Sequence, residues 1–186
     1  MLRRNFLNAL VALPLALIGG RGARAQAGKG QGPDVAALQA DWKSLLAPNA
    51  DVAKAAEPLS LTNAEWKKRL SADAYDVLRN EGTEPPGTSP LNREKRPGVF
   101  VCAGCALPLF TSAMKYESGT GWPSFFTTIP GALATKTDYK LILPRTEYHC
   151  VRCGGHHGHL FDDGPPPTRQ RYCNNGVALR FIPRTA

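Results

Sequence analysis

Two Cys-x-x-Cys pairs constrain the fold of this chain more than any other feature of its sequence. The pairs are Cys102 with Cys105 and Cys150 with Cys153, and each follows residues that are typical of a β-strand. Four thiolates that converge from two strand ends suit a tetrahedral zinc ion, with Zn–S distances of about 2.3 Å. Two disulfide bonds are the alternative, since disulfides persist in oxidising compartments. We expect zinc, and therefore a fold that brings two distant strand ends together.

The strand signals occupy the second half of the chain. Strands are predicted over 99–101, 139–143 and 146–149, and a longer strand over 171–181. The first and third of these run directly into the cysteine pairs. The long strand has apolar residues at its odd positions from 177 onward, which predicts that this end is anchored in the core.

Helical patterns precede the strands. A first helix begins at Asp34, carries apolar residues at helical spacing and closes at Pro48. A second begins at Thr62 and Glu65, which form a capping-box pattern, and a third covers 71–80. A Pro- and Gly-rich connection, 82–97, follows. The predicted fold class is mainly β with N-terminal helices (α+β).

Cys173 is the fifth cysteine and stands outside both pairs. In an extended strand Arg171, Cys173 and Asn175 point to the same face. A guanidinium nearby favours the nucleophilic thiolate, and an asparagine amide can donate to an oxygen bound beside it. A buried, unreactive thiol is the alternative. The polar neighbours argue against an apolar niche, so local chemistry leaves a reactive thiol and a buried thiol equally open.

Two further stretches carry candidate site residues. Trp122 lies on a Gly- and Pro-rich turn, where a rigidly held indole can wall a small apolar pocket, although an ordinary core aromatic fits equally well. His156, His157 and His159 lie among glycines, shortly before Asp163. Four cysteines already complete a metal site, so the histidines are available for acid–base work, with a carboxylate to orient them.

Residues 1–25 have the pattern of an export signal. Arg3 and Arg4 form a twin-arginine start, an apolar run covers 9–18, and a small-x-small cleavage site covers 23–25. The run is about half of the roughly 20 residues that a membrane span requires. We therefore predict a bacterial protein exported to the periplasm, with no stable membrane insertion after the signal is removed.

The charge of the mature chain gives no reason to expect a nucleic-acid partner. The full sequence has 23 Lys and Arg against 15 Asp and Glu, a net charge of +8. Residues 1–25 hold four arginines and no acidic residue, which leaves 19 basic against 15 acidic residues and a net charge of +4. That charge is mild for a domain of this size. We expect a monomer.

The spaced motifs together resemble the methionine sulfoxide reductase B family, which reduces the R epimer of methionine sulfoxide. The motifs are RNEGTEPP, the two Cys-x-x-Cys pairs, GTGWPSFF, HHGHLFDDGPPPT and RYCNNGVALRF, within residues 60–184. The resemblance implies two antiparallel sheets, a catalytic domain over 60–186, and a linker with a helical extension over 26–59. It also implies structural zinc on the four paired cysteines and Cys173 as the nucleophile.

The remaining implied roles belong to the active site. His156 and His159 match the family's active-site histidines, and the supporting residues are Trp122, Asp163, Arg171 and Asn175. The implied chemistry is attack by Cys173, protonation by one of the two histidines, and a Cys173 sulfenic acid that an external thiol, such as a thioredoxin-like donor, reduces. Many relatives carry a recycling cysteine where this chain has Thr120.

Two other functional classes remain open on chemistry alone. One is a zinc-ribbon-like binding or scaffold module without catalysis, which would require the paired cysteines but neither Cys173 nor the histidines. The other is a thiol hydrolase that uses a Cys–His pair. This chain retains Cys173 and the histidines, which argues against the module, whereas only the resemblance ranks the hydrolase below the reductase.

Overall fold

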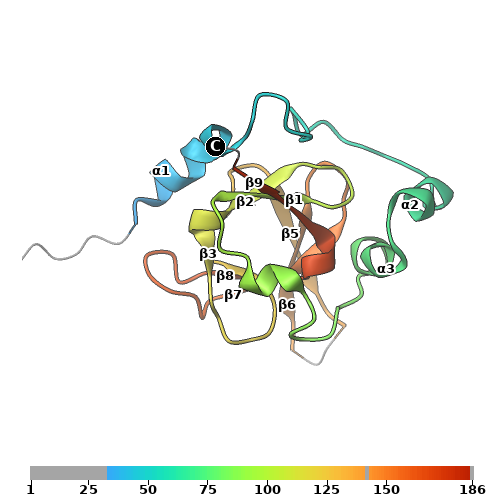
Figure 1. The fold of residues 1–186 in the computed structure, drawn as a ribbon. Helices are drawn as coiled ribbons and strands as arrows, with labels where there is room; N and C mark the ends of the chain where they lie inside the picture. Colours follow the sequence, from blue (N-terminus) through green and yellow to red (C-terminus); the bar gives the residue numbers. More distant parts are fainter. Residues whose placement is uncertain (1–32, 141–142, 185–186) are drawn as a thin grey trace, which may run out of the picture. The chain divides into compact units, whose positions relative to one another are not determined.

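The structure of the chain, a computed structural model, describes residues 33–140 and 143–184 (Figure 1). The predicted signal peptide, residues 1–25, lies outside the described residues. Among the helices that the structure describes, none combines the length and apolar character needed to span a membrane. The account below concerns the unit that begins after residue 30.

Three short helical segments precede the sheets, as the sequence predicts. Helix α1 covers Val35–Ala40, and the Asp34 side chain caps it by accepting from the Ala37 N–H; the chain then tightens into the 3₁₀ segment η1, Asp41–Leu45. Helix α2 covers Asn63–Arg69, and its capping box of Thr62 and Glu65 is confirmed. Helix α3 covers Ala72–Asn80 and starts from an N-cap serine.

Two antiparallel sheets form the body of the fold, which confirms the predicted class. The smaller sheet has the strand order β2-β1-β9, and the larger sheet has the order β3-β4-β8-β7-β6-β5. The strands of the smaller sheet are β1 (Gly98–Cys102), β2 (Pro108–Thr111) and β9 (Leu179–Pro183). The strands of the larger sheet are β3 (Lys115–Tyr116), β4 (Ser124–Phe125), β5 (Leu133–Asp138), β6 (Arg145–Cys150), β7 (His156–Phe161) and β8 (Arg171–Asn174).

Aromatic side chains join the two sheets into one core. Phe110 of β2 stacks on Phe125 of β4 with 4.0 Å between ring centroids, and Phe100 of β1 meets Phe125 edge-on at 5.0 Å. All three rings are fully buried. Burying several such side chains, each worth roughly 1.5–3 kcal/mol, holds the larger sheet against the smaller one.

The segment before residue 60 packs against this core. Leu38 and Trp42 lie partly buried on it, and the Leu59 N–H donates to the Arg152 carbonyl at 2.6 Å. The predicted boundary at residue 60 stays a prediction. The extension is nonetheless in direct contact with the body of the fold.

Two strand predictions are wrong in detail. A strand over 139–143 was expected, but β5 ends at Asp138, whose side chain accepts the Lys140 N–H at 2.8 Å and turns the chain; residues 141–142 lie outside the described part. The expected continuous strand over 171–181 is broken. Strand β8 ends at Asn174, the 3₁₀ turn η4 (Gly176–Ala178) follows, and β9 pairs in the other sheet.

The break has a physical cause in the connection 82–97, which also contains the short 3₁₀ segment η2 (Pro90–Arg93). The buried carboxylate of Glu84 accepts the N–H groups of Gly176 and Val177. These donors would otherwise continue a strand ladder. Charge-assisted bonds of this kind contribute about 1.5–3 kcal/mol each, so the turn is strongly held.

Candidate active site

One row of side chains crosses five strands of the larger sheet and contains the predicted nucleophile. The register pairs Lys136 with Glu147, Glu147 with His159, His159 with Cys173, and Cys173 with Ser124. Directly opposed residues of antiparallel strands have their side chains on the same face, with Cβ atoms about 4.5–5.5 Å apart. The sheet therefore places His159 immediately beside Cys173.

A second row runs parallel to the first. It pairs Asp138 with Arg145 across β5 and β6, and Phe161 with Arg171 across β7 and β8. The Arg171 guanidinium lies 4.2 Å from the centre of the Phe161 ring and makes two bonds to Asp163, of 2.7 and 2.9 Å. This ion pair holds Arg171 on the same face as Cys173, as predicted. Asp163 thus holds the Arg171 guanidinium in place, and the Asp163 side chain is largely exposed.

A β-bulge in β7 explains why His156 reaches the same region as His159 although they are three residues apart. The register shifts so that Tyr148 opposes Gly158 while the next residue, His149, opposes His156, which leaves His157 as the extra residue. The rings of His156 and His159 meet edge-on with 5.5 Å between centroids. His157 is fully buried against Tyr148, and burial lowers its pKa to about 3.

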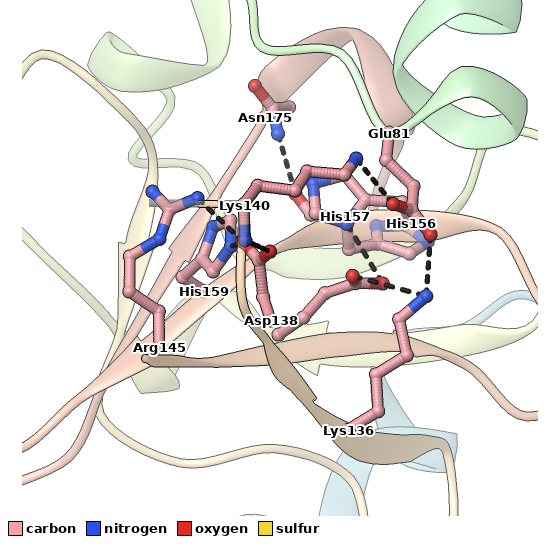
Figure 2. Close-up of polar contacts among 10 residues, drawn as sticks. Glu81, Lys136, Asp138, Lys140, Arg145, His156, His157, His159 and Asn175 are labelled. Carbon is pink, nitrogen blue, oxygen red and sulfur yellow. Dashed lines mark hydrogen bonds and ion pairs between the residues drawn. The ribbon is translucent and has the colours of Figure 1, made fainter. Parts of the chain in front are cut away.

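Each of the two candidate histidines has a carboxylate partner that the sequence did not indicate. The Nε2 atom of His159 lies 2.8 Å from Asp138 Oδ2, and Arg145 binds the same oxygen at 2.6 Å (Figure 2). The Nδ1 atom of His156 lies 3.1 Å from Glu147 Oε1. Asp163 had been expected to orient the histidines. The structure assigns that position to Asp138 and Glu147.

The two histidines differ in their access to solvent and substrate. His156 is buried, and this burial lowers its pKa, with Glu147 opposing the shift only in part. A neutral imidazole is therefore favoured at His156. His159 lines the pocket beside Cys173, whereas His156 is not among the residues that line it.

The pocket at Cys173 has a volume of about 180 Å³, which suits a single side chain of a substrate. We call it the Cys173 pocket; its lining residues are Thr83, Trp122, Arg145, Gly158, His159, Phe161, Cys173 and Asn175. The Trp122 indole forms one wall, as predicted. Its N–H donates to the Glu84 carbonyl at 3.1 Å, which fixes the ring and leaves no donor for a ligand.

Cys173 is half-buried, and two influences oppose each other at its thiol. The guanidinium of Arg171 was expected to favour the thiolate, and it does lower the pKa of Cys173. Burial raises the pKa of Cys173, and Arg171 and the Thr120 hydroxyl lower it only in part. The thiol is therefore the favoured resting form, and formation of the thiolate requires a base or a bound substrate.

Asn175 also differs from its predicted role. It lies beyond the end of β8, so it does not share the face of Cys173 by strand alternation. Its side-chain oxygen accepts the Glu84 N–H at 3.0 Å, and its side-chain nitrogen donates to the His157 carbonyl at 3.0 Å. The amide oxygen and one of the two side-chain N–H groups thus tie the connection 82–97 to β7, and Asn175 lines the Cys173 pocket.

The four paired cysteines form one buried cluster that fits a metal ion. Their sulfurs all lie within 4.8 Å of one another, with 3.6 Å between Cys102 and Cys153 and 3.5 Å between Cys105 and Cys150. Ligand sulfurs of a tetrahedral zinc site are about 3.8 Å apart, as Zn–S distances of 2.3 Å require. Hydrogen bonds within the cluster raise the pKa of Cys102 and lower that of Cys105.

The cluster is built from two equivalent turns. In each turn the residue after the pair donates its N–H to the carbonyl of the first cysteine: Ala106 to Cys102 at 2.8 Å, and Gly154 to Cys150 at 2.9 Å. Both donors have positive φ, 59° and 66°. One turn belongs to the smaller sheet and the other to the larger, so a bound ion would join the two sheets.

The fold and site define a class of protein: a two-sheet β-protein with one accessible thiol beside a histidine and a separate four-cysteine cluster. The family model described as the SelR domain matches residues 70–183. The chain belongs to this family, the methionine sulfoxide reductase B family.

Relatives with curated names agree with this assignment. The chain is 45% identical over 123 residues to the peptide methionine sulfoxide reductase MsrB of Agrobacterium fabrum, covering 66% of this chain and 91% of that one. It is 49% identical over 118 residues to the protein of that name from Methanosarcina barkeri, covering 63% and 83%. The chloroplastic peptide methionine sulfoxide reductase B1 of Arabidopsis thaliana is 46% identical over 134 residues, 72% of this chain and 66% of that one.

Proposed function

We propose that the chain reduces methionine (R)-sulfoxide to methionine with Cys173 as the nucleophile. The observation that carries this proposal is the register of His159 against Cys173 inside a small pocket walled by Trp122. Membership of the SelR family and the names of the relatives support the same reaction.

The reaction has a simple balance. The Cys173 thiol and the sulfoxide give a Cys173 sulfenic acid and the thioether of methionine, so the oxygen passes to Cys173 and the thiol sulfur loses the two electrons that the sulfoxide sulfur gains. The sulfoxide oxygen must be protonated to leave the substrate sulfur. His159 is the donor we assign, because it lines the pocket and His156 does not.

Three residues prepare the pocket for this substrate. Trp122, fixed by Glu84, shelters the methyl group of the sulfoxide. Arg171 lies in the row beside Cys173 and favours its thiolate. Asp163 holds Arg171 in that position.

Zinc is the metal we assign to the four-cysteine cluster. Cys102, Cys105, Cys150 and Cys153 would hold it, and the spacing of their sulfurs supports a tetrahedral site. The ion would stabilise the fold by joining two sheets and would take no part in the reaction.

An external thiol, such as a thioredoxin-like protein, is the reductant we assign to the sulfenic acid. The paired cysteines are engaged in the cluster, and Thr120 occupies the position where many relatives have a recycling cysteine. Attack by the external thiol would give a mixed disulfide, which a second thiol resolves.

The cellular setting that we propose rests on the sequence pattern of the first 25 residues. The twin-arginine pattern of Arg3 and Arg4 supports export to the periplasm, where the substrates would be oxidised methionines of exported proteins. We expect a monomer that does not bind nucleic acid. Replacement of both arginines by lysine should retain the protein in the cytoplasm, which fractionation of cells would measure.

The decisive experiment incubates the purified protein with dithiothreitol and the separated sulfoxide epimers. The expected result is loss of the R epimer and persistence of the S epimer. If neither epimer were consumed, the result would support a zinc-ribbon-like binding or scaffold module without catalysis. Hydrolysis of a thioester without sulfoxide reduction would favour a thiol hydrolase.

A further inference from the structure

The carboxylate behind His159 is held more firmly than a surface ion pair. Asp138 is 6% exposed, and three donors converge on it: the Lys140 N–H at 2.8 Å, Arg145 at 2.6 Å and His159 at 2.8 Å. Figure 2 shows His159 and Arg145 both directed at the carboxylate of Asp138. The hydrogen bond from the Lys140 backbone contributes most to lowering the pKa of Asp138, followed by the bond to His159.

We propose that Asp138 is the positioning residue of the reaction, which fixes the tautomer and the orientation of His159 through its Nε2 atom. This inference deepens the proposed function and rests on it. An ionised carboxylate has no proton to donate, so the hydrogen between Asp138 and His159 belongs to Nε2. The free nitrogen of the imidazole is then Nδ1.

The consequence is a defined direction for the proton. Nδ1 of His159 exchanges protons with the Cys173 pocket, while Asp138 keeps the imidazole in place and balances the positive charge when the ring is protonated. During reduction Nδ1 accepts the proton of the Cys173 thiol and passes it to the sulfoxide oxygen, so the ring ends the step in the neutral form in which it began. Asp138 itself does not change its protonation state, as in other carboxylate–histidine pairs.

Other charged groups also lie around His159. Glu147 opposes His159 on β6, but its Oε1 atom lies 3.1 Å from His156 and its Oε2 atom 3.3 Å from Lys136. The remaining neighbours are Arg145 from β6, His156 from β7 and Cys173 from β8. Asp138 is therefore the carboxylate in hydrogen-bonding contact with His159.

The first test reads the tautomer directly and needs no substrate. In the ¹⁵N spectrum of histidine-labelled protein above pH 8, we expect the neutral His159 of the unaltered chain to carry its hydrogen on Nε2. In Asp138→Asn we expect a shift toward the Nδ1–H form, because an amide can donate to Nε2. A hydrogen on Nδ1 in the unaltered protein, or identical spectra for both proteins, would overturn the proposal.

The second test asks whether Asp138 acts through His159. Single-turnover formation of methionine, without reductant, should slow by about 10- to 100-fold in Asp138→Asn, within the usual contribution of acid–base catalysis. In a His159→Asn background the same substitution should slow it by less than about twofold, since residues that act as one unit are not additive. Equal losses in both backgrounds would refute the proposal.

A matched control separates this effect from the loss of any ion pair. Asp51 pairs with Arg180 at 2.9 Å, on the smaller sheet side of the molecule, and its side chain is largely exposed. Asp51→Asn should leave the single-turnover rate unchanged. If the unaltered chain reduced no sulfoxide at all, the proposed function would fail, while the tautomer measurement would still decide the role of Asp138.

Discussion

The five cysteines of the chain lie in two regions that give the thiol different surroundings. In the cluster, four sulfurs lie within 4.8 Å of one another, and Cys102 and Cys150 are fully buried. At the pocket, Cys173 is half-buried in a row of polar side chains, between His159 and Ser124. Neighbours, and not residue type, decide whether a thiol serves as a ligand or as a nucleophile.

Removal of one cluster cysteine should have the largest effect on stability. Cys102→Ser should lose the metal and destabilise the fold by several kcal/mol, since structural zinc contributes on the order of 10 kcal/mol. Elemental analysis and thermal unfolding measure both changes. Cys173→Ser is the matched control and should retain one metal ion per chain. A metal-free protein with two disulfides by mass spectrometry would contradict the prediction.

Removal of Cys173, the fifth cysteine, should instead remove activity and leave the stability of the fold nearly unchanged. Cys173→Ser should lower the rate of sulfoxide reduction by at least about 10³-fold, or about 4 kcal/mol, because no other accessible thiol lies in the described pocket. The unfolding temperature should stay within a few degrees of the unaltered protein. Activity that survives in this variant would remove Cys173 from the mechanism.

A smaller effect should separate the two influences on the Cys173 thiol. Burial raises its pKa and Arg171 lowers it, so Arg171→Gln should raise the pKa further. The thiolate would then form at higher pH. The rate of alkylation of Cys173 by iodoacetamide, measured as a function of pH, should therefore have its midpoint at a higher pH than in the unaltered protein. Arg180→Gln, on the other sheet, should leave the titration unchanged. An unaltered midpoint in Arg171→Gln would show that the guanidinium does not act on the thiol.

The smallest change should add a thiol without disturbing either region. Thr120 occupies the position where many relatives have a recycling cysteine, and its hydroxyl is among the groups that lower the pKa of Cys173. Thr120→Cys should therefore form a disulfide with Cys173 after one turnover, and peptide mapping would detect it. In the unaltered protein a sulfenic-acid reagent should label Cys173. A disulfide from Cys173 to a cluster cysteine would contradict the proposed recycling.

The sequence predicted what local patterns can encode. The capping box at Thr62, the helix that begins after Asp34 and the two cysteine pairs were all recognisable, because each depends on residues close together in the chain. The placement of His159 beside Cys173 required the register of β7 against β8, which no local pattern contains.

The features that were missed depend on contacts between distant segments. Glu84 is a buried carboxylate that caps the turn after β8, some ninety positions further along the chain, so the long strand predicted there could not form. Asp138 and Glu147 lie on β5 and β6, and only the sheet brings them behind the histidines. Glu147 lies within the expected strand 146–149 and Asp138 directly precedes the expected strand 139–143, but no local pattern links either carboxylate to a histidine.

The bulge in β7 limits how this active site can be transplanted. His156 and His159 share a face only because His157 is accommodated as an extra residue. A designer who copied the two histidines at the same spacing onto a regular hairpin would place them on opposite faces of the sheet. The unit that can be grafted is therefore the irregular strand with its buried His157 and the strand that opposes it, and not the two imidazoles alone.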